Sequence, residues 1–261
     1  MARPGYTSSA AVMARRHAPL DDLDYFPTPA WATRALFEYV LKPRNLCPRM
    51  AWEPAAGGGH MVRALREYVP FVRASDIEDY GAGFEQRDFL AATGPRKTPI
   101  ITNPPFSRAL DFALKAHALQ APLVALFVRT AFLEGAERYN KLWSKHPEFI
   151  LAPFSCRVGL TRDVAVRKVS SATSYAWVVW GRGVSGTSIV HIPPEARPRL
   201  ERTHDYDADD PAAVLTCGEC GEIFVPGPGV DPDEASVLAA HAGWAVGDTV
   251  LCQQCKEDRT C

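Results

Sequence analysis

Residues 50–59 read Met-Ala-Trp-Glu-Pro-Ala-Ala-Gly-Gly-Gly, a short apolar run that leads into a glycine-rich turn. We expect a strand over residues 50–53. After the turn, apolar side chains from Met61 to Tyr68 recur at the spacing of one helix face, so we expect a helix there. Glycines at such a place let the backbone turn tightly and approach a ligand closely. The turn is neither the G-x-G-x-x-G pattern of dinucleotide sites nor a P-loop, so neither a dinucleotide nor ATP is favoured.

The alternation of strand and helix continues along the chain. Apolar runs predict strands at 71–74, 99–102, 122–129, 149–153 and 174–180, and helices at 110–119 and 134–145. Ahead of the glycine turn, Thr28 is expected to cap a helix that begins at Pro29. This pattern predicts an α/β fold with a Rossmann-like, doubly wound, mostly parallel sheet and an antiparallel closing strand.

The 261 residues suffice for one α/β domain of about 200 residues and a small appendage. We expect a disordered basic N-terminus (residues 1–20), the α/β domain (21–192), a charged Pro-rich linker (193–213) and a separate small module (214–261). The sequence has no apolar run of 18 residues and no apolar signal segment at its start. We therefore expect a cytoplasmic protein that does not contact a membrane.

Charge is distributed unevenly between the two parts of the chain. Residues 1–200 contain 26 Lys and Arg against 17 Asp and Glu, a net charge of +9, whereas residues 201–261 carry −10. A basic body fits a polyanionic partner such as a nucleic acid, although two ordinary surfaces on separate domains would give the same totals.

Polar residues follow two further expected strands. Asp76 follows the strand at 71–74, and Asn103-Pro104-Pro105-Phe106 follows the strand at 99–102. In an open α/β sheet these strand ends share one edge, where ligands bind, and an acid placed like Asp76 can accept hydrogen bonds from ribose hydroxyls. The prolines lack N–H groups, which leaves the Pro104 carbonyl and the Asn103 amide oxygen to accept bonds from an amino group. Phe106 offers a flat face on which a base can stack.

With these motifs the chain resembles the Rossmann-like amino-methyltransferases, and specifically the adenine-N6 DNA methyltransferases, over residues 21–185. Asn103-Pro104-Pro105-Phe106 is similar to their catalytic signature. The resemblance implies S-adenosylmethionine as methyl donor and direct in-line attack by the exocyclic N6 of a flipped adenine. The positions that it implies for donor binding are Tyr25, Thr28, Glu53, Ala55, Gly57, Gly59, Asp76, Asp88 and Asn103. Unlike restriction-type enzymes, the chain has no large recognition domain after the core, which puts narrow sequence specificity in doubt.

Two segments are candidates for nucleic-acid contact. Arg129 and Phe132 follow the strand at 122–129 and are expected at the same sheet edge as Phe106. The connection between the two closing strands is basic, and its candidate phosphate contacts are Arg157, Arg162, Arg167 and Lys168. The alternative for each segment is a buried phenylalanine or a solvated loop.

Four cysteines near the C-terminus form two C-x-x-C pairs, Cys217 with Cys220 and Cys252 with Cys255. Four thiolates at this spacing favour a structural Zn²⁺ in a zinc-ribbon-like module over a redox dithiol. The metal would supply much of the folding free energy of so small a unit. Because the module is acidic, we expect it to bind a protein partner or the basic catalytic face more readily than phosphate.

Other functions stay open at this point. An RNA adenine-N6 methyltransferase would use the same catalytic residues. Methyltransferases of protein glutamine amides carry a similar Asn-Pro-Pro segment, usually followed by tyrosine where this chain has Phe106. A catalytically silent subunit could instead use the fold and the zinc module only for assembly.

Overall fold

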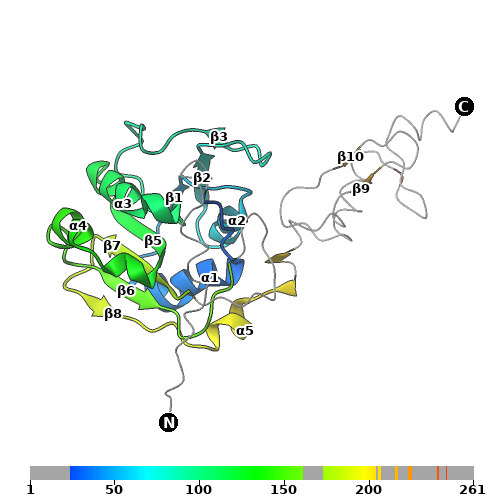
Figure 1. The fold of residues 1–261 in the computed structure, drawn as a ribbon. Coiled ribbons are helices and arrows are strands. Elements are labelled where there is room, and N and C mark those ends of the chain that lie inside the picture. The colour runs from blue at the N-terminus through cyan, green and yellow to red at the C-terminus, as the bar shows by residue number, and fades with distance from the viewer. Residues whose placement is uncertain are drawn as a thin grey trace, which may run out of the picture.

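The computed structural model of the chain describes residues 24–160, 173–203, 205–206, 215–216, 223–224, 240 and 245. Most of them build an eight-stranded sheet with helices on both faces (Figure 1). Its strands are β1 (Met50–Glu53), β2 (Phe71–Asp76), β3 (Glu85–Gln86), β4 (Ile100–Thr102), β5 (Leu123–Arg129), β6 (Ile150–Pro153), β7 (Tyr175–Gly181) and β8 (Ser188–Ile189).

The strand order is β3-β2-β1-β4-β5-β7-β6-β8. Strand β7 runs antiparallel to both β5 and β6, and the other neighbouring pairs are parallel. Without β7 the order of the first six strands is the doubly wound 3-2-1-4-5-6, in which the direction of winding reverses between β1 and β4. The predicted mostly parallel sheet with an antiparallel strand is therefore confirmed, and its switch point lies at the ends of β1 and β4.

Helices cover both faces of the sheet. Helix α1 (Ala30–Ala35) continues as the π-helical segment η1 (Leu36–Leu41) and the 3-10 turn η2 (Lys42–Arg44), and α2 (His60–Arg66) follows β1. The turn η3 (Phe106–Arg108) and α3 (Ala109–Ala118) follow β4. After β5 come η4 (Thr130–Leu133), α4 (Ala136–Arg138) and η5 (Tyr139–Trp143), and α5 (Ala196–Leu200) follows β8. Of these, α1, η1 and α2 lie on one face of the sheet, and α3 and η5 lie on the other.

The alternation of side chains along β5 divides the core into two layers. Ala125 and Phe127 face the layer formed with α1, η1 and α2, whereas Val124, Leu126 and Val128 face α3 and η5. All five are 1% exposed or less, as expected for a strand buried on both faces. The apolar stripe predicted for the first helix is also buried, since Trp31, Leu36, Phe37 and Val40 are at most 1% exposed.

Arg34 of α1 holds the segment that follows β8 against the α/β domain. It is 4% exposed, and its guanidinium donates to the Glu67 carboxylate (2.8 Å), the Asp205 carboxylate (2.7 Å) and the Leu200 carbonyl (2.6 Å). Helix α5 also packs on α1, and its Ala196 is fully buried. Residues 193–203 and 205–206 therefore differ from the linker that we expected, because a buried arginine and an apolar contact hold them on the domain.

Other expectations differ locally. Pro29, rather than Thr28, is the N-cap of α1, and no side chain caps this helix. The helix expected over 134–145 is reduced to α4 and the π-helical η5. Residues 1–20, expected to be disordered, lie outside the described residues. In the described part of the chain, no helix is long and apolar enough to cross a membrane.

The structure also describes two short strands near the C-terminus. Strand β9 (Leu215–Thr216) pairs antiparallel with β10 (Ile223–Phe224). The expected zinc ligands Cys217 and Cys220 fall in the connection between these two strands, and Cys252 and Cys255 follow later. All four cysteines lie outside the described residues.

Candidate active site

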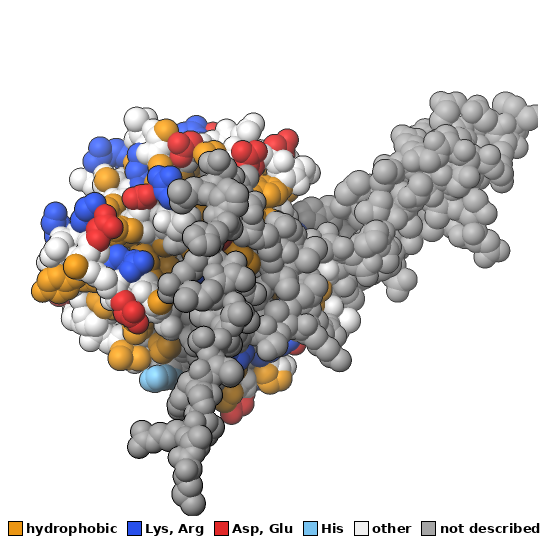
Figure 2. All heavy atoms as spheres, viewed as in Figure 1, with side chains coloured by type: hydrophobic (Ala, Val, Ile, Leu, Met, Phe, Trp, Pro, Cys, Tyr) orange, Lys and Arg blue, Asp and Glu red, His pale blue; other side chains and the backbone are white. Residues whose placement is uncertain are grey.

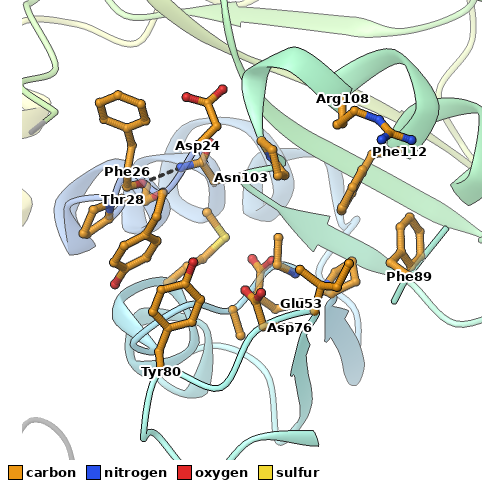
Figure 3. A pocket seen from close by; sticks show the side chains of 18 of the residues that line it. Asp24, Phe26, Thr28, Glu53, Asp76, Tyr80, Phe89, Asn103, Arg108 and Phe112 are labelled. Carbon is orange, nitrogen blue, oxygen red and sulfur yellow. Dashed lines mark hydrogen bonds between the residues drawn. The ribbon is translucent and has the colours of Figure 1, made fainter. Parts of the chain in front are cut away.

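A cavity of about 600 Å³ lies at the switch point of the sheet. Its walls come from the segment before α1, the ends of β1, β2 and β4, and the start of α3 (Figure 3). Seven of the nine predicted donor-binding residues line it: Tyr25, Thr28, Glu53, Ala55, Asp76, Asp88 and Asn103. The topology thus brings together residues that are up to 78 positions apart in the sequence, from Tyr25 to Asn103.

Glu53, the last residue of β1, joins the two strands at the switch point. Its Oε1 accepts bonds from the Ala55 N–H (2.9 Å) and from the Thr102 hydroxyl (2.5 Å). The side chain is fully buried, and its Oε2 has no hydrogen-bond partner among the described residues. Burial raises the pKa of this carboxyl to about 8, and the charge of Asp76 adds to the rise, whereas the bonds from Thr102 and the backbone lower it.

Asp76, the last residue of β2, holds the glycine turn. Its Oδ2 accepts a bond from the Gly57 N–H (2.8 Å), and its Oδ1 accepts one from the Glu78 N–H (3.1 Å). Burial raises the pKa of Asp76, and the backbone N–H groups oppose this rise. The acid that was predicted to bind ribose therefore also fixes the conformation of the turn.

The aromatic ring of Tyr25 covers the glycine turn. Gly57 has a φ of +50°, and a Cβ built on it would lie 2.2 Å from Tyr25 Cε2. The Tyr25 hydroxyl accepts a bond from the Gly58 N–H (3.0 Å) and lies 3.3 Å from His60 Nδ1. Gly59 has a φ of +86° and caps α2. Neither Gly57 nor Gly59 lines the cavity. Both positions require glycine because a Cβ would clash with Tyr25 at Gly57 and with Phe84 at Gly59.

Asn103, directly after β4, lines the cavity and has a buried side-chain oxygen without a donor among the described residues. Its Nδ2 donates to the Phe26 carbonyl (2.8 Å), shown as the dashed line in Figure 3. This bond fixes the orientation of the amide, so Oδ1 is the atom left over. Oδ1 is buried, and the described residues provide no hydrogen-bond donor for it. A buried acceptor without a donor is costly, so a ligand that supplies an N–H group at this point would be stabilised.

The rest of the Asn-Pro-Pro-Phe segment lies differently from the prediction. Pro105 lines the cavity, whereas Pro104 is buried and Phe106 does not reach it. The ring of Phe106 is covered by the guanidinium of Arg129, 4.3 Å from the ring centroid, and contacts Phe26 and Tyr175 at 5.6 Å and 5.8 Å. The face expected to be open for a base is therefore occupied by a cation.

The end of β5 places Arg129 over this ring, and Arg157, after β6, bonds to the residue before β7. Arg129 and Arg157 are both exposed. The Ser174 hydroxyl accepts a bond from Arg157 (2.9 Å), and Ser174 precedes Tyr175, which pairs with Arg129 across β5 and β7. Arg162, Arg167 and Lys168 lie outside the described residues.

The predicted nucleic-acid contact at Phe132 is not supported by the structure. It is 5% exposed and packs against Trp143 in the core, with ring centroids 5.6 Å apart. Because a buried ring cannot meet a nucleic acid, we no longer count Phe132 as a nucleic-acid contact. The alternative reading of a buried phenylalanine accounts for its position.

Several residues of the cavity were missed by sequence reasoning. Phe89 and Phe112 form an apolar wall with centroids 4.8 Å apart, and Tyr80 packs on Tyr25 at 4.6 Å. Phe89 follows the predicted Asp88 and could have been found from that neighbour. Asp88 itself is exposed, and its Oδ1 accepts a bond from the Leu90 N–H (2.8 Å), which forms a local turn. A role of Asp88 in ligand binding stays a prediction.

Charges of both signs are interspersed on the visible described surface, which carries no large field of one sign (Figure 2). Within the described residues, no group of three or more His, Cys, Asp and Glu side chains is placed to hold a metal ion.

The sequence and the structure can be compared with those of known proteins. No family model and no curated protein matches the sequence. Similar solved structures include a candidate class I S-adenosylmethionine-dependent methyltransferase from Listeria monocytogenes, with a TM-score of 0.49 and 11% identity, covering 72% of this chain and 71% of that one. A candidate RNA methyltransferase from Pyrococcus horikoshii has a TM-score of 0.46 and 15% identity, covering 66% and 95%. At this level of similarity, the function must be argued from the site itself.

Proposed function

We propose that this protein transfers a methyl group from S-adenosylmethionine to the exocyclic N6 of adenine in DNA. The observation that carries the proposal is the buried, unpartnered Oδ1 of Asn103 at the edge of the cavity. An acceptor held in this way selects a ligand with an N–H group, and the exocyclic amine of adenine is such a group. The resemblance of Asn103-Pro104-Pro105-Phe106 to the adenine-N6 signature supports the same substrate.

The cavity suits the proposed donor. S-Adenosylmethionine supplies an electrophilic methyl group on a sulfonium when it is bound. Glu53 and Asp76 offer carboxyl oxygens, and Phe89 and Phe112 form an apolar wall on which the adenine of the donor could pack. The unpartnered Oε2 of Glu53 is a second buried acceptor that a ligand could satisfy.

Asn103 would act on the amine. Adenine N6 is a weak nucleophile because its lone pair is delocalised into the ring. Hydrogen bonds from N6 to Asn103 Oδ1 and to the Pro104 carbonyl would draw the nitrogen toward tetrahedral geometry, and these bonds strengthen as the transition state forms. The Phe26 carbonyl, which holds Nδ2 of Asn103 at 2.8 Å, keeps the acceptor oxygen in place. Holding both reactants in line would supply much of the remaining acceleration.

Nucleic-acid contacts are proposed for the end of β5 and the connection after β6. Arg129 is exposed beside Phe106, Arg157 is exposed after β6, and Arg162, Arg167 and Lys168 follow Arg157 in the same basic connection. Such residues would bind phosphates and position the strand. A flipped base would then stack on Phe106.

The C-terminal module is proposed to hold a structural Zn²⁺ through Cys217, Cys220, Cys252 and Cys255. The antiparallel pairing of β9 and β10 on either side of the first C-x-x-C pair supports a hairpin of the kind that carries zinc ligands. We expect one zinc per chain by elemental analysis of the purified protein and none after Cys217→Ser with Cys252→Ser. Equal zinc content in that variant would reject the site.

The test of the main proposal uses purified protein, labelled S-adenosylmethionine and separate duplex DNA, single-stranded DNA and RNA. We expect N6-methyladenine in DNA, and its loss in the Asn103→Ala variant. Label confined to RNA would keep the reaction and change the substrate. No label in any nucleic acid, with the donor bound, would reject adenine as the acceptor.

A further inference from the structure

The cavity is acidic. Four carboxyl groups line it, those of Asp24, Glu53, Asp76 and Asp88. Among the described residues Arg108 is the one arginine on its wall, and Arg108 is paired with Asp111 through Nε at 2.7 Å. A cavity with this balance favours a ligand of positive net charge, because opposite charges attract strongly where water is excluded.

Glu53 is the deepest of these acids. The others are exposed or partly exposed, whereas the side chain of Glu53 is fully buried and has a bare Oε2. The described ionisable groups of the cavity come from several elements: Asp76 from β2, His60 from α2, Asp24 and Tyr25 from the segment before α1, and Tyr80, Asp88 and Arg108 elsewhere on the wall. No lysine lines the cavity among the described residues, so a cationic partner for Glu53 has to arrive with the ligand.

Building on the proposed function, we propose that Glu53 is a charge sensor: its carboxyl is protonated in the empty cavity and releases its proton when the cationic methyl donor binds. The O–H bond of the carboxyl breaks, the proton passes to bulk solvent, and the carboxylate remains to neutralise the donor. The high pKa of the buried carboxyl, about 8, agrees with the protonated starting state near neutral pH.

This exchange would distinguish substrate from product. S-Adenosylmethionine carries a sulfonium, so its net charge is one unit more positive than that of S-adenosylhomocysteine, whose sulfur is neutral. After methyl transfer the carboxylate faces a ligand of lower charge, so it takes up a proton from solvent again as the product leaves. The preference of Glu53 for the donor over the product would therefore increase as pH rises toward about 8 and level off above it.

The experiment is titration calorimetry of the full-length protein with S-adenosylmethionine and with S-adenosylhomocysteine, in buffers of different ionisation enthalpy, from pH 6.5 to 9. Near pH 7 we expect wild-type protein to release most of one proton on binding the donor and clearly less on binding the product. The preference for the donor should grow at least threefold across this pH range.

Glu53→Gln is the matched variant, because its amide oxygen can still accept the bonds from Ala55 and Thr102. The α-amino group of the ligand titrates in the same pH range. Proton release measured with the Gln variant therefore gives the contribution of this amino group, which is subtracted from the wild-type value. We expect Glu53→Gln to lose the extra proton release and the pH-dependent preference, and Glu137→Gln, which removes an exposed carboxyl outside the cavity, to keep both.

Equal proton release by wild-type protein and Glu53→Gln would overturn the inference. If the Gln variant does not fold, a donor preference of wild-type protein that is constant from pH 6.5 to 9 would overturn it as well. Absence of binding heat for both ligands would instead reject the proposed function, so the two failures can be told apart.

Discussion

The two halves of the site differ in how complete they are without a ligand. At the ends of β1 and β2, the glycine turn is held by Asp76 and by the ring of Tyr25, and the described part of the chain leaves Oε2 of Glu53 without a hydrogen-bond partner. At the ends of β4 and β5, Asn103 Oδ1 is bare and the ring of Phe106 is covered by Arg129. The half proposed to bind the donor, at the ends of β1 and β2 (the donor half), is thus preorganised. In the half proposed to bind the base, at the ends of β4 and β5 (the acceptor half), a side chain must move before a base can stack.

If the acceptor half depends on one oxygen, Asn103→Ala should have the largest effect on catalysis. We expect kcat to fall by roughly 10²–10³-fold, the usual loss when one group that stabilises the transition state is removed. Donor affinity, measured by calorimetry, should change much less than kcat because six of the seven predicted donor-binding residues on the cavity wall are other residues. Asn103→Asp, which keeps an acceptor oxygen but loses the donor to the Phe26 carbonyl, should retain more activity than Ala. Equal activity of Ala and wild type would contradict the assignment.

The donor half can be tested through the buried carboxyl of Glu53. Its pKa is raised from 4.5 to about 8 in the folded chain. For a raised pKa, the stabilisation is fully present below pH 4.5 and is lost as pH rises through about 8. The melting temperature of ligand-free protein should therefore fall between pH 6 and pH 8.5 by on the order of 5–10 °C more than that of Glu53→Gln. Parallel pH profiles of the two proteins would show that Glu53 is not the group responsible.

Gly57→Ala should disrupt the donor half by sterics alone. Its φ of +50° is unfavourable for alanine, and the new Cβ would lie 2.2 Å from the ring of Tyr25. We expect a loss of about 1–3 kcal/mol in the free energy of unfolding and at least tenfold weaker donor binding. Gly186→Ala is the matched control, because Gly186 has a φ of +69° but no atom within 4 Å of a Cβ. The difference between the two variants measures the contact with Tyr25, and equal donor affinity in both would show that the contact is unimportant.

Local sequence patterns predicted the sheet and the position of the site because both depend on short apolar strands that end in polar residues. Glu53, Asp76 and Asn103 could be found in this way, since the ends of parallel strands necessarily share one edge. Asp88 could be placed at the cavity only with the help of a family resemblance.

The contacts that sequence reasoning missed are those between distant side chains. Nothing local to Arg129 indicates that it covers Phe106, and nothing local to Tyr80 indicates that it packs on Tyr25. Helix α5 was mistaken for a linker because its sequence is charged and Pro-rich, and its attachment through Arg34 to Asp205 spans 171 positions. Phe132 was misplaced for a related reason, because an aromatic residue after a strand can turn toward either the core or solvent.

The acceptor half can be tested most finely at Arg129. A base that stacks on Phe106 must displace the guanidinium, and an exposed cation–π contact contributes only about 0.5–1 kcal/mol, so the displaced arginine is free to bind a phosphate at small cost. We expect Arg129→Ala to weaken binding of a DNA oligonucleotide by roughly 3–10-fold at low salt and to reduce the salt dependence by about one phosphate contact. Arg129→Lys should restore the salt dependence because it keeps the charge. Arg73→Ala, which removes an exposed arginine that covers Trp52 three strands away, should leave DNA binding nearly unchanged. Tighter binding by Arg129→Ala at every salt concentration would mean that Arg129 only covers the ring, and the acceptor half would then open without any contribution from phosphate.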